Sequence, residues 1–137
     1  MSTLVIYYSY TGHTKSIAEN MAKADSSDLL EVNEIATRSK LGTYFFGSFA
    51  AMRQKSVELQ QFDADFSSYD KIVIAMPIWA GYPAPAINSI IDLLPSGKEI
   101  ELIMVSGSGN SSGSENKTKA LIEARGCSVV KYQDIKG

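Results

Sequence analysis

Three short, largely apolar runs, interrupted only by Glu101, limit the folds open to this chain more than any other feature of its sequence. They occupy residues 4–8, 72–76 and 100–105, and most of their side chains are aliphatic or aromatic. Short apolar runs of this kind are typical of strands buried on both faces, as in a parallel sheet covered by helices. Two further strands are predicted at residues 30–33, where apolar and polar side chains alternate, and at residues 129–132.

Helical periodicity appears between the strands. A first helix is predicted from residue 14 to about residue 25, because apolar side chains recur there three and four positions apart. The same spacing predicts a second helix over residues 87–94. A third is predicted over residues 112–125, where Ser112 and Glu115 have the spacing of a capping box.

This alternation of strands and helices predicts the fold class. Continuous apolar strands separated by helices indicate an α/β protein with three layers, in which a doubly wound parallel sheet of five strands carries helices on both faces. The length of 137 residues fits a single domain, residues 1–137. Pro77 is expected to end the strand at residues 72–76, because proline cannot donate to a strand ladder.

Composition excludes several function classes. The net charge of −2 gives no basic field for nucleic acid, and 45% apolar residues argue against disorder. One cysteine, Cys127, and one histidine, His13, allow no internal disulfide and no Cys/His zinc site, so no metal site is predicted. Neither a signal peptide nor an apolar run of membrane-spanning length is found, so a cytoplasmic protein that does not bind membranes is expected.

Three loops should carry the function. In an open parallel sheet, ligands bind beyond the carboxyl ends of the strands, where the strand order reverses. Residues 9–14, 77–82 and 106–113 each follow a predicted central strand and therefore reach that edge. The three segments are therefore expected to contain the ligand-binding residues.

The first loop, residues 9–14, combines the short hydroxyl side chains of Ser9, Thr11 and Thr14 with Gly12 and leads into a helix. Backbone N–H groups at a helix start can surround an anion, although Ser and Thr also cap helices with no ligand present. The loop lacks the Gly-Lys pair of a P-loop, and the dinucleotide fingerprint is absent. Cys127 lies outside any phosphate loop and is expected to be a small buried residue rather than a nucleophile.

The second loop carries the only tryptophan, Trp79, followed by Ala80 and Gly81. A single tryptophan is often a core residue, but at this edge of the sheet it would suit stacking on a flat ligand. The third loop, rich in serine and glycine, offers hydrogen-bond donors to a polar ring edge. The three loops therefore predict a ligand with an anion at one end and a planar ring at the other.

These motifs resemble the flavodoxin family over nearly the whole chain. Ser9-x-Thr11-Gly12-x-Thr14 is similar to the family's FMN phosphate loop, and Pro77-Ile78-Trp79 to the loop whose tryptophan covers the isoalloxazine. The resemblance implies FMN as the cofactor, a flavodoxin-like sheet of strand order 2-1-3-4-5, and no catalytic residues. It assigns the cofactor contacts to Ser9, Tyr10, Thr11, Gly12, His13, Thr14, Pro77, Ile78, Trp79, Ala80, Gly81, Ser106, Gly107, Ser108 and Gly109.

Three hypotheses for the function follow from the resemblance. The first is a low-potential one-electron carrier between redox partner proteins. The second is an FMN-dependent NAD(P)H reductase of quinones or nitro compounds, in which His13 and Tyr82 are the only candidate proton donors of the loops. The third is a protein-binding module that has the fold without the flavin. The third loop lacks the tyrosine that many flavodoxins place there, which would suit an open flavin face and hydride transfer.

Two further features bear on partners. The family's final helix is missing after the last predicted strand, which is expected to leave apolar sheet uncovered and to favour a homodimer. The segment 38–61 contains an aromatic patch that includes Tyr44, Phe45 and Phe46. It is interpreted either as a helix packed on the sheet or as a lid over the flavin.

Overall fold

A parallel sheet of five strands forms the centre of the structure, a computed structural model that describes residues 3–8, 12–32, 66–79, 81–84 and 86–137. The strand order is β2-β1-β3-β5-β6, as the α/β fold class with order 2-1-3-4-5 predicts. A sixth strand, β4, pairs antiparallel with the end of β3. The strands are β1 (Thr3–Tyr7), β2 (Asp28–Glu31), β3 (Lys71–Trp79), β4 (Tyr82–Pro83), β5 (Glu99–Ser106) and β6 (Ser128–Lys136).

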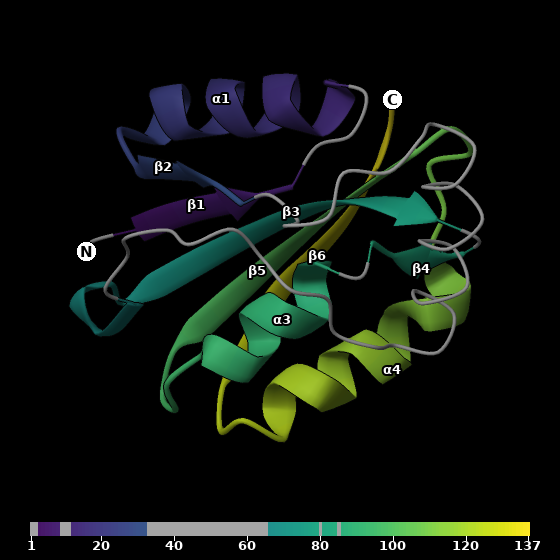
Figure 1. Cartoon of the computed structure of the whole chain (residues 1–137). Helices are drawn as coiled ribbons and strands as arrows, with labels where there is room; N and C mark the ends of the chain where they lie inside the picture. The colour runs from purple at the N-terminus through teal and green to yellow at the C-terminus, as the bar shows by residue number, and fades with distance from the viewer. Residues whose placement is uncertain (1–2, 9–11, 33–65, 80, 85) are drawn as a thin grey trace.

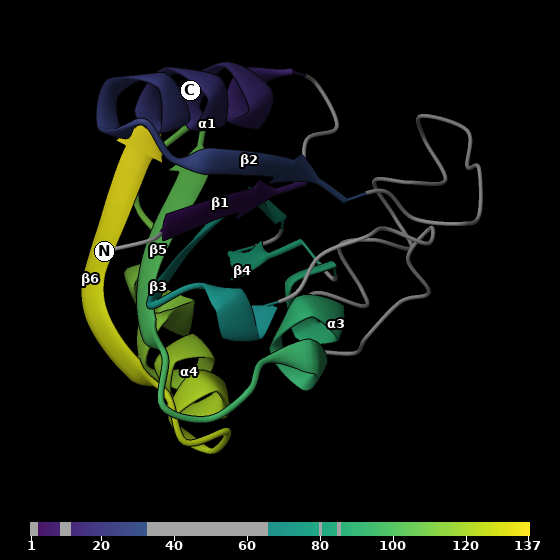
Figure 2. The ribbon, with the colours of Figure 1, turned by 90° about the vertical axis from the view of Figure 1, so that its left-hand side faces the viewer.

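Helices cover both faces of the sheet and complete three layers (Figure 1). α1 (His13–Asp25) lies on one face, and α3 (Ala86–Leu93) and α4 (Ser112–Glu123) lie on the other, as Figure 2 shows from the side. A short 3-10 turn, η1 (Phe66–Ser68), precedes β3. None of the helices in the described ranges is long and apolar enough to cross a membrane.

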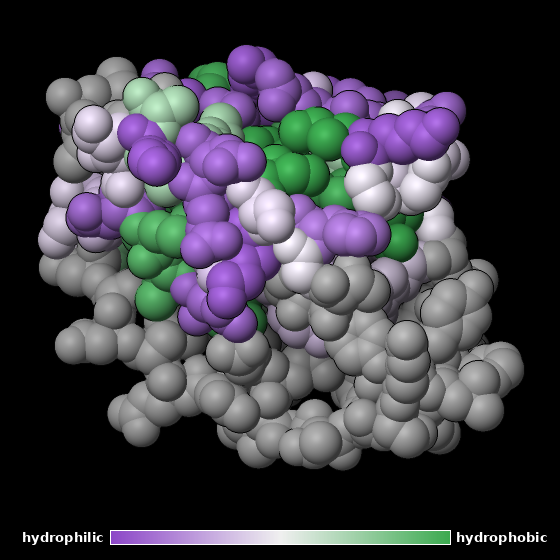
Figure 3. Space-filling view, turned by 90° about the horizontal axis from the view of Figure 1, so that it is seen from above, coloured by the Kyte–Doolittle hydropathy of each residue, from purple (hydrophilic) through white to green (hydrophobic). Residues whose placement is uncertain are grey.

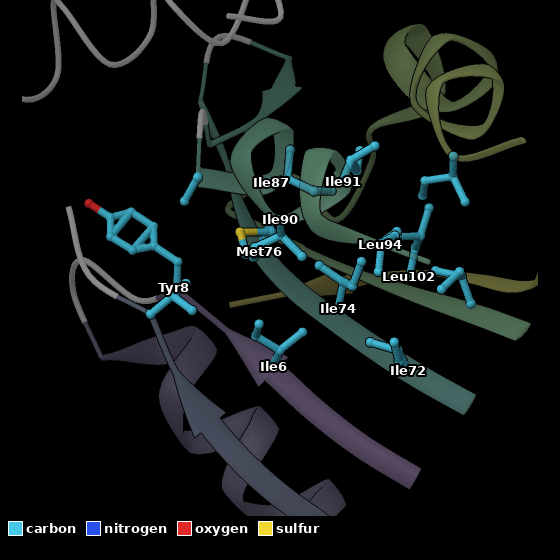
Figure 4. Packing of buried hydrophobic residues seen from close by; sticks show 14 of the residues in the cluster. Ile6, Tyr8, Ile72, Ile74, Met76, Ile87, Ile90, Ile91, Leu94 and Leu102 are labelled. Atoms are coloured by element: carbon cyan, nitrogen blue, oxygen red, sulfur yellow. The ribbon is translucent and has the colours of Figure 1, made fainter. Parts of the chain in front are cut away.

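Alternation along the central strands divides the core into two clusters. The larger core cluster lies under α3 and α4 and includes isoleucines of β1, β3 and α3 (Figure 4). The smaller core cluster lies under α1. Its buried members are Val5, Tyr7, Ala18, Ala22, Val73, Ala75, Ile103 and Val105. The short apolar runs form strands because both of their faces are buried in this way.

The α1 face of the sheet is less bare than the sequence suggests. Val73, Ile103 and Val105 are 1%, 1% and 4% exposed, so the strand residues on this face are buried. Apolar residues remain visible between polar ones when this face is seen from above (Figure 3), and Val130 of β6 is 51% exposed. The expected homodimer stays a prediction.

Pro77 does not end β3, contrary to expectation. The strand continues through Pro77 to Trp79, and Pro77 remains in register with Val105 of β5. Alternate residues of a strand direct their backbone N–H and C=O groups to the same side. Ala75, two residues before Pro77, accepts a hydrogen bond from the Tyr8 N–H, so the backbone of Pro77 also faces the side of β1. β1 has ended at that level, and the missing proline N–H leaves no partner of the ladder unsatisfied.

Other element boundaries also differ from the predicted ones. β2 begins two residues earlier than expected, while the last strand, β6, runs on to Lys136. A β-bulge opposite Ile100 and Glu101 shifts the register of β6 by one residue. The expected capping box is absent, because Glu115 pairs with Lys119 and the Ser112 N–H donates to the side chain of Asn110 instead.

Candidate functional site

Parallel pairing brings the three predicted loops to one edge of the sheet. Tyr7 lies opposite Ala75 in the β1–β3 ladder, and Pro77 lies opposite Val105 in the β3–β5 ladder, so the three strands end close together. The described part of the site comprises Gly12 to Thr14, Pro77 to Trp79, Gly81 and Ser106 to Gly109. Ser9, Tyr10, Thr11, Ala80 and the segment 38–61 lie outside the described residues.

Gly12 shapes the start of α1. Its φ of +99° lies in the left-handed region, which glycine enters at low cost, and its carbonyl accepts from the Ser16 N–H and hydroxyl. The first turn of α1 contains no acidic residue, while His13 and Lys15 are exposed there. A helix start of this kind is electropositive and presents N–H groups to an anion.

Thr14 and His13 differ in their surroundings. Thr14 is 2% exposed and belongs to the buried polar residues, whereas His13 is exposed.

Trp79 is the last residue of β3 and is partly buried against the larger core cluster. Its ring meets the ring of Tyr8 edge-on, with centroids 5.9 Å apart and planes inclined by 73°. Tyr8 itself is buried at the margin of the cluster, and its hydroxyl points away from the isoleucines (Figure 4). The indole is therefore held along one side without being enclosed by the described residues, as stacking on a planar ligand requires.

A tight hairpin follows Trp79. Trp79 and Tyr82 are partners across the hairpin, and Gly81 between them has a φ of +84°. A two-residue connection of this type requires positive φ, which accounts for the glycine. The Ala84 N–H donates to the Pro77 carbonyl at 2.9 Å and closes the base of the hairpin.

Tyr82 connects the hairpin to α4. The Lys117 amine donates to the Tyr82 hydroxyl at 2.9 Å, and both residues are separated by 35 positions in the sequence. Because the Tyr82 hydroxyl already accepts this bond, it is oriented by Lys117. Tyr82 is one of the two candidate proton donors of the loops; its hydroxyl accepts from Lys117 and keeps its own proton to donate.

The first part of the third loop, residues 106–109, forms a turn that is closed by hydrogen bonds between its own residues. The Gly109 N–H donates to the hydroxyl and carbonyl of Ser106, at 2.9 and 3.3 Å. Gly109 has a φ of +71°, and a Cβ there would lie 3.3 Å from the Cβ of Lys136. Within the described ranges the N–H groups of Gly107 and Ser108 have no partner, so they are the donors that this loop can offer to a ligand.

A buried hydroxyl network supports the end of this loop. The Ser111 hydroxyl donates to the Asp134 carboxylate at 2.5 Å and accepts from the Tyr132 hydroxyl at 2.5 Å. Burial is the main reason that the pKa of Tyr132 is raised above its usual value, and the bond to Ser111 opposes this shift. Asp134 and Tyr132 thereby fix the start of α4 to β6.

Three contributors to the site were missed by the sequence analysis: Tyr8, Lys117 and Asp134. Tyr8 was predicted as the last residue of a buried strand; it is buried, but β1 ends at Tyr7, and the contact of Tyr8 with Trp79 depends on the alignment of β1 with β3. Lys117 and Asp134 reach their partners across long sequence separations. No local pattern marks such pairs, because they exist only after the sheet has assembled.

The described residues offer little for acid–base or metal chemistry. No group of His, Cys, Asp and Glu among them could hold a metal ion. Cys127 is buried directly before β6, where its thiol donates to the Pro95 carbonyl, as expected of a small core residue. The candidate site therefore combines an electropositive helix start with an aromatic side chain and a turn that presents N–H donors.

Comparison with known proteins identifies the family that this chain matches. The family whose description is Flavodoxin matches residues 2–135, nearly the whole chain. No curated protein sequence matches. A solved flavoprotein of Lactobacillus acidophilus NCFM, crystallised in complex with FMN, is 26% identical, covers 96% of this chain and 91% of its own, and has a TM-score of 0.80.

Two other solved structures are also similar. The apo-form of the Lactobacillus acidophilus flavoprotein is 28% identical, with coverage of 97% of this chain and 92% of its own and a TM-score of 0.71. Flavodoxin 2 from Bacillus cereus is 15% identical, covers 99% of this chain and 84% of its own, and has a TM-score of 0.59, a likeness that concerns the fold alone.

Proposed function

The chain belongs to the flavodoxin family, and on that premise we propose that it binds FMN and acts as a one-electron carrier between redox proteins. One observation carries the proposal. α1, which starts after Gly12, follows β1, and Trp79 is the last residue of β3, the strand that pairs with β1. An anion site and a stacking surface at adjacent strand ends match the two ends of FMN, its phosphate and its ring.

The residues present fit the cofactor. Gly12 allows the chain to turn into α1 with its N–H groups directed outward, and the absence of acidic residues from the first turn avoids repulsion of a phosphate. Trp79 would cover one face of the ring, while Gly107 and Ser108 would donate to its polar edge. When bound, FMN supplies the electron acceptor and donor, and the protein supplies orientation and local electrostatics.

FMN titration of the apoprotein tests the binding. Trp79 is the only tryptophan, so its fluorescence reports on the ring site directly and should be quenched as FMN binds. Trp79→Leu should weaken FMN affinity by roughly tenfold to a hundredfold, the range expected when an aromatic stacking partner is lost. Leu93→Ala is the matched control, because Leu93 is 54% exposed at the far end of α3.

Riboflavin, which has the ring of FMN but lacks its phosphate, distinguishes binding of the phosphate from binding of the ring. If the start of α1 binds the phosphate, wild-type protein should bind FMN much more tightly than riboflavin, and Trp79→Leu should weaken both ligands equally. Equal affinity for FMN and riboflavin in the wild-type protein would contradict the assignment of the first loop. No binding of either flavin would leave a protein with the fold but without the cofactor.

Anaerobic reduction tests the electron-carrier role. Stepwise addition of reductant to the FMN complex should give two separate one-electron steps. The same experiment tests a second candidate function, an FMN-dependent NAD(P)H reductase. Lys15 and Lys136 are exposed cations beside the first and third loops, which suits an anionic reductant such as NADPH. Rapid NADPH oxidation with a quinone acceptor, without a partner protein, would favour a reductase instead.

A further inference from the structure

The hairpin that carries Trp79 is weakly held by its own backbone. Its second strand, β4, contains only Tyr82 and Pro83, and Pro83 has no N–H to donate. Two-stranded pairings of this length are barely stable alone. Contacts from outside the hairpin must therefore set the position of its tip.

Two side-chain contacts supply that support. Tyr8 of the β1 end meets the Trp79 ring on one side, and Lys117 of α4 donates to the Tyr82 hydroxyl on the other. Trp79 and Tyr82 are direct partners across the antiparallel pair, so their side chains emerge on the same face of the hairpin. A contact that fixes the position of the Tyr82 side chain therefore also restrains the backbone of Trp79.

Lys117 connects this hairpin to the third loop. α4 begins at Ser112, at the end of that loop, and packs beside β4. The amine of Lys117 lies 2.9 Å from the Tyr82 hydroxyl and 5.5 Å from the centre of its ring. The contact thus links the second loop to the helix that leads out of the third.

We propose that Lys117 is a positioning residue for Trp79: its hydrogen bond to the Tyr82 hydroxyl fixes the β3–β4 hairpin against α4 and so sets the orientation in which the indole meets the flavin ring. The proposal rests on the proposed function only for its last step. The fixing of the hairpin concerns this chain alone and can be tested without FMN.

Neighbouring Lys119 provides a matched control. It lies two residues further along α4 and forms an ion pair with Glu115, with its amine 5.4 Å from the centre of the Tyr132 ring. It makes no described contact with the hairpin. Lys119→Met therefore removes the same charge from the same helix without removing the bond to Tyr82.

The first experiment uses the apoprotein. Trp79 fluorescence anisotropy and its quenching by acrylamide are compared among wild type, Lys117→Met, Tyr82→Phe, the double variant and Lys119→Met. We expect Lys117→Met and Tyr82→Phe to lower the anisotropy and raise the quenching to a similar extent, the double variant to add nothing further, and Lys119→Met to match wild type. Thermal unfolding of each variant confirms that it is folded.

The second experiment repeats the set with FMN. Lys117→Met and Tyr82→Phe should each weaken FMN binding by roughly threefold to tenfold, the effect of one lost hydrogen bond on a binding surface, and should shift the midpoint potential in the same direction. Lys117→Arg, which retains a donor, should restore most of the affinity.

Tyr82→Phe keeps the charge of Lys117 and removes only the acceptor. If Lys117→Met changes both readouts while Tyr82→Phe changes neither, Lys117 acts through its charge and the proposal is wrong. An effect of Lys119→Met equal to that of Lys117→Met would overturn it as well. If wild-type protein binds no FMN, the proposed function fails, yet the apoprotein fluorescence still decides whether Lys117 fixes the hairpin.

Discussion

The Lys71 amine lies 2.8 Å from one carboxylate oxygen of Glu101, and the other oxygen of Glu101 is buried without a hydrogen-bond partner among the described residues. Glu101 is 2% exposed and lies in β5 among apolar neighbours, whereas Lys71 is 27% exposed at the start of β3. Among the described residues Lys71 is the only cation in ion-pair contact with Glu101, because Lys131, which lies opposite Glu101 in β6, forms no such pair. The buried carboxylate therefore depends on Lys71.

Removal of that neighbour should destabilise the protein strongly. Lys71→Met leaves an uncompensated buried carboxylate and should lower the free energy of unfolding by about 3 kcal/mol, the lower end of the range for broken buried pairs. The double variant Lys71→Met with Glu101→Leu should recover most of this loss. Urea unfolding measures both, and a double variant no more stable than Lys71→Met would contradict the account.

Alkaline pH should expose the role of Tyr7. Burial, and then the hydrogen bond from its hydroxyl to Glu31, raise the pKa of Tyr7 far above the usual 10.0. The folded protein therefore keeps this proton while the unfolded chain releases it above pH 10. Unfolding then releases a proton, so the stability that Tyr7 contributes is intact below pH 10 and is lost as pH rises above it.

Tyr7→Phe isolates this effect. The variant should be less stable than wild type near pH 8, because the bond to Glu31 is lost. The stability difference should shrink by about 1.4 kcal/mol per pH unit above pH 10. Urea unfolding from pH 8 to pH 11.5 measures it, and a constant difference over that range would show that Tyr7 titrates alike in both states.

Gly126 and Gly97 form a matched pair. Both have positive φ, of +84° and +82°, but a Cβ on Gly126 would lie 2.9 Å from the Cβ of Ser96, whereas Gly97 has open space. Gly97→Ala should therefore cost about 1 kcal/mol from backbone strain alone. Gly126→Ala should cost about 1–3 kcal/mol more from the overlap.

Ser96→Gly should relieve only the second variant. Because Ser96 supplies the atom that a Gly126 side chain would meet, adding Ser96→Gly to Gly126→Ala should bring its melting temperature near that of Gly97→Ala. A rescue of Gly97→Ala by the same change would point to a different cause.

Gly12 should matter more for the ligand than for the fold. A Cβ at Gly12 would meet nothing within 4 Å, but the φ of +99° is strained for alanine. Gly12→Ala should therefore turn the start of α1 and weaken FMN binding by roughly tenfold, while its effect on unfolding stays near 1 kcal/mol.

Gly113→Ala is the control for Gly12→Ala. Gly113 lies in the first turn of α4, also with open space around it and without a positive φ. Alanine there favours the helix, so FMN affinity should be unchanged and stability equal or higher. Equal losses of FMN affinity in the two variants would remove the special role of Gly12.

The central strands and helices could be predicted from the sequence because their apolar spacing reflects burial directly. Ile72 to Met76 and Ile87 to Leu94 are such cases, and the structure confirms both elements. The end of β6 was predicted wrongly: the strand was expected to stop at Tyr132, before the polar Gln133 and Asp134, but it continues to Lys136. Its bulge opposite Ile100 and Glu101 depends on the pairing with β5 and has no local signal.

The candidate site was predicted in outline rather than in detail. Gly12 and Trp79 stand out locally, one as a glycine before a helix and the other as a lone indole after a strand. The burial of Glu101 and the contact of Lys117 with Tyr82 depend on residues about 30 positions away. Pairings of that separation are created by strand register, which no local pattern encodes.

Pro77 sets a boundary for β1 rather than for β3. The residue opposite the end of β1 would have to donate an N–H for that ladder to grow, and Pro77 has none, while its carbonyl is taken by Ala84. The last bond between the two strands is therefore the one from the Tyr8 N–H to the Ala75 carbonyl, beyond the final paired residues Tyr7 and Ala75. A substitution that restored the N–H at position 77 would return a strand donor to this edge, beside the candidate anion site.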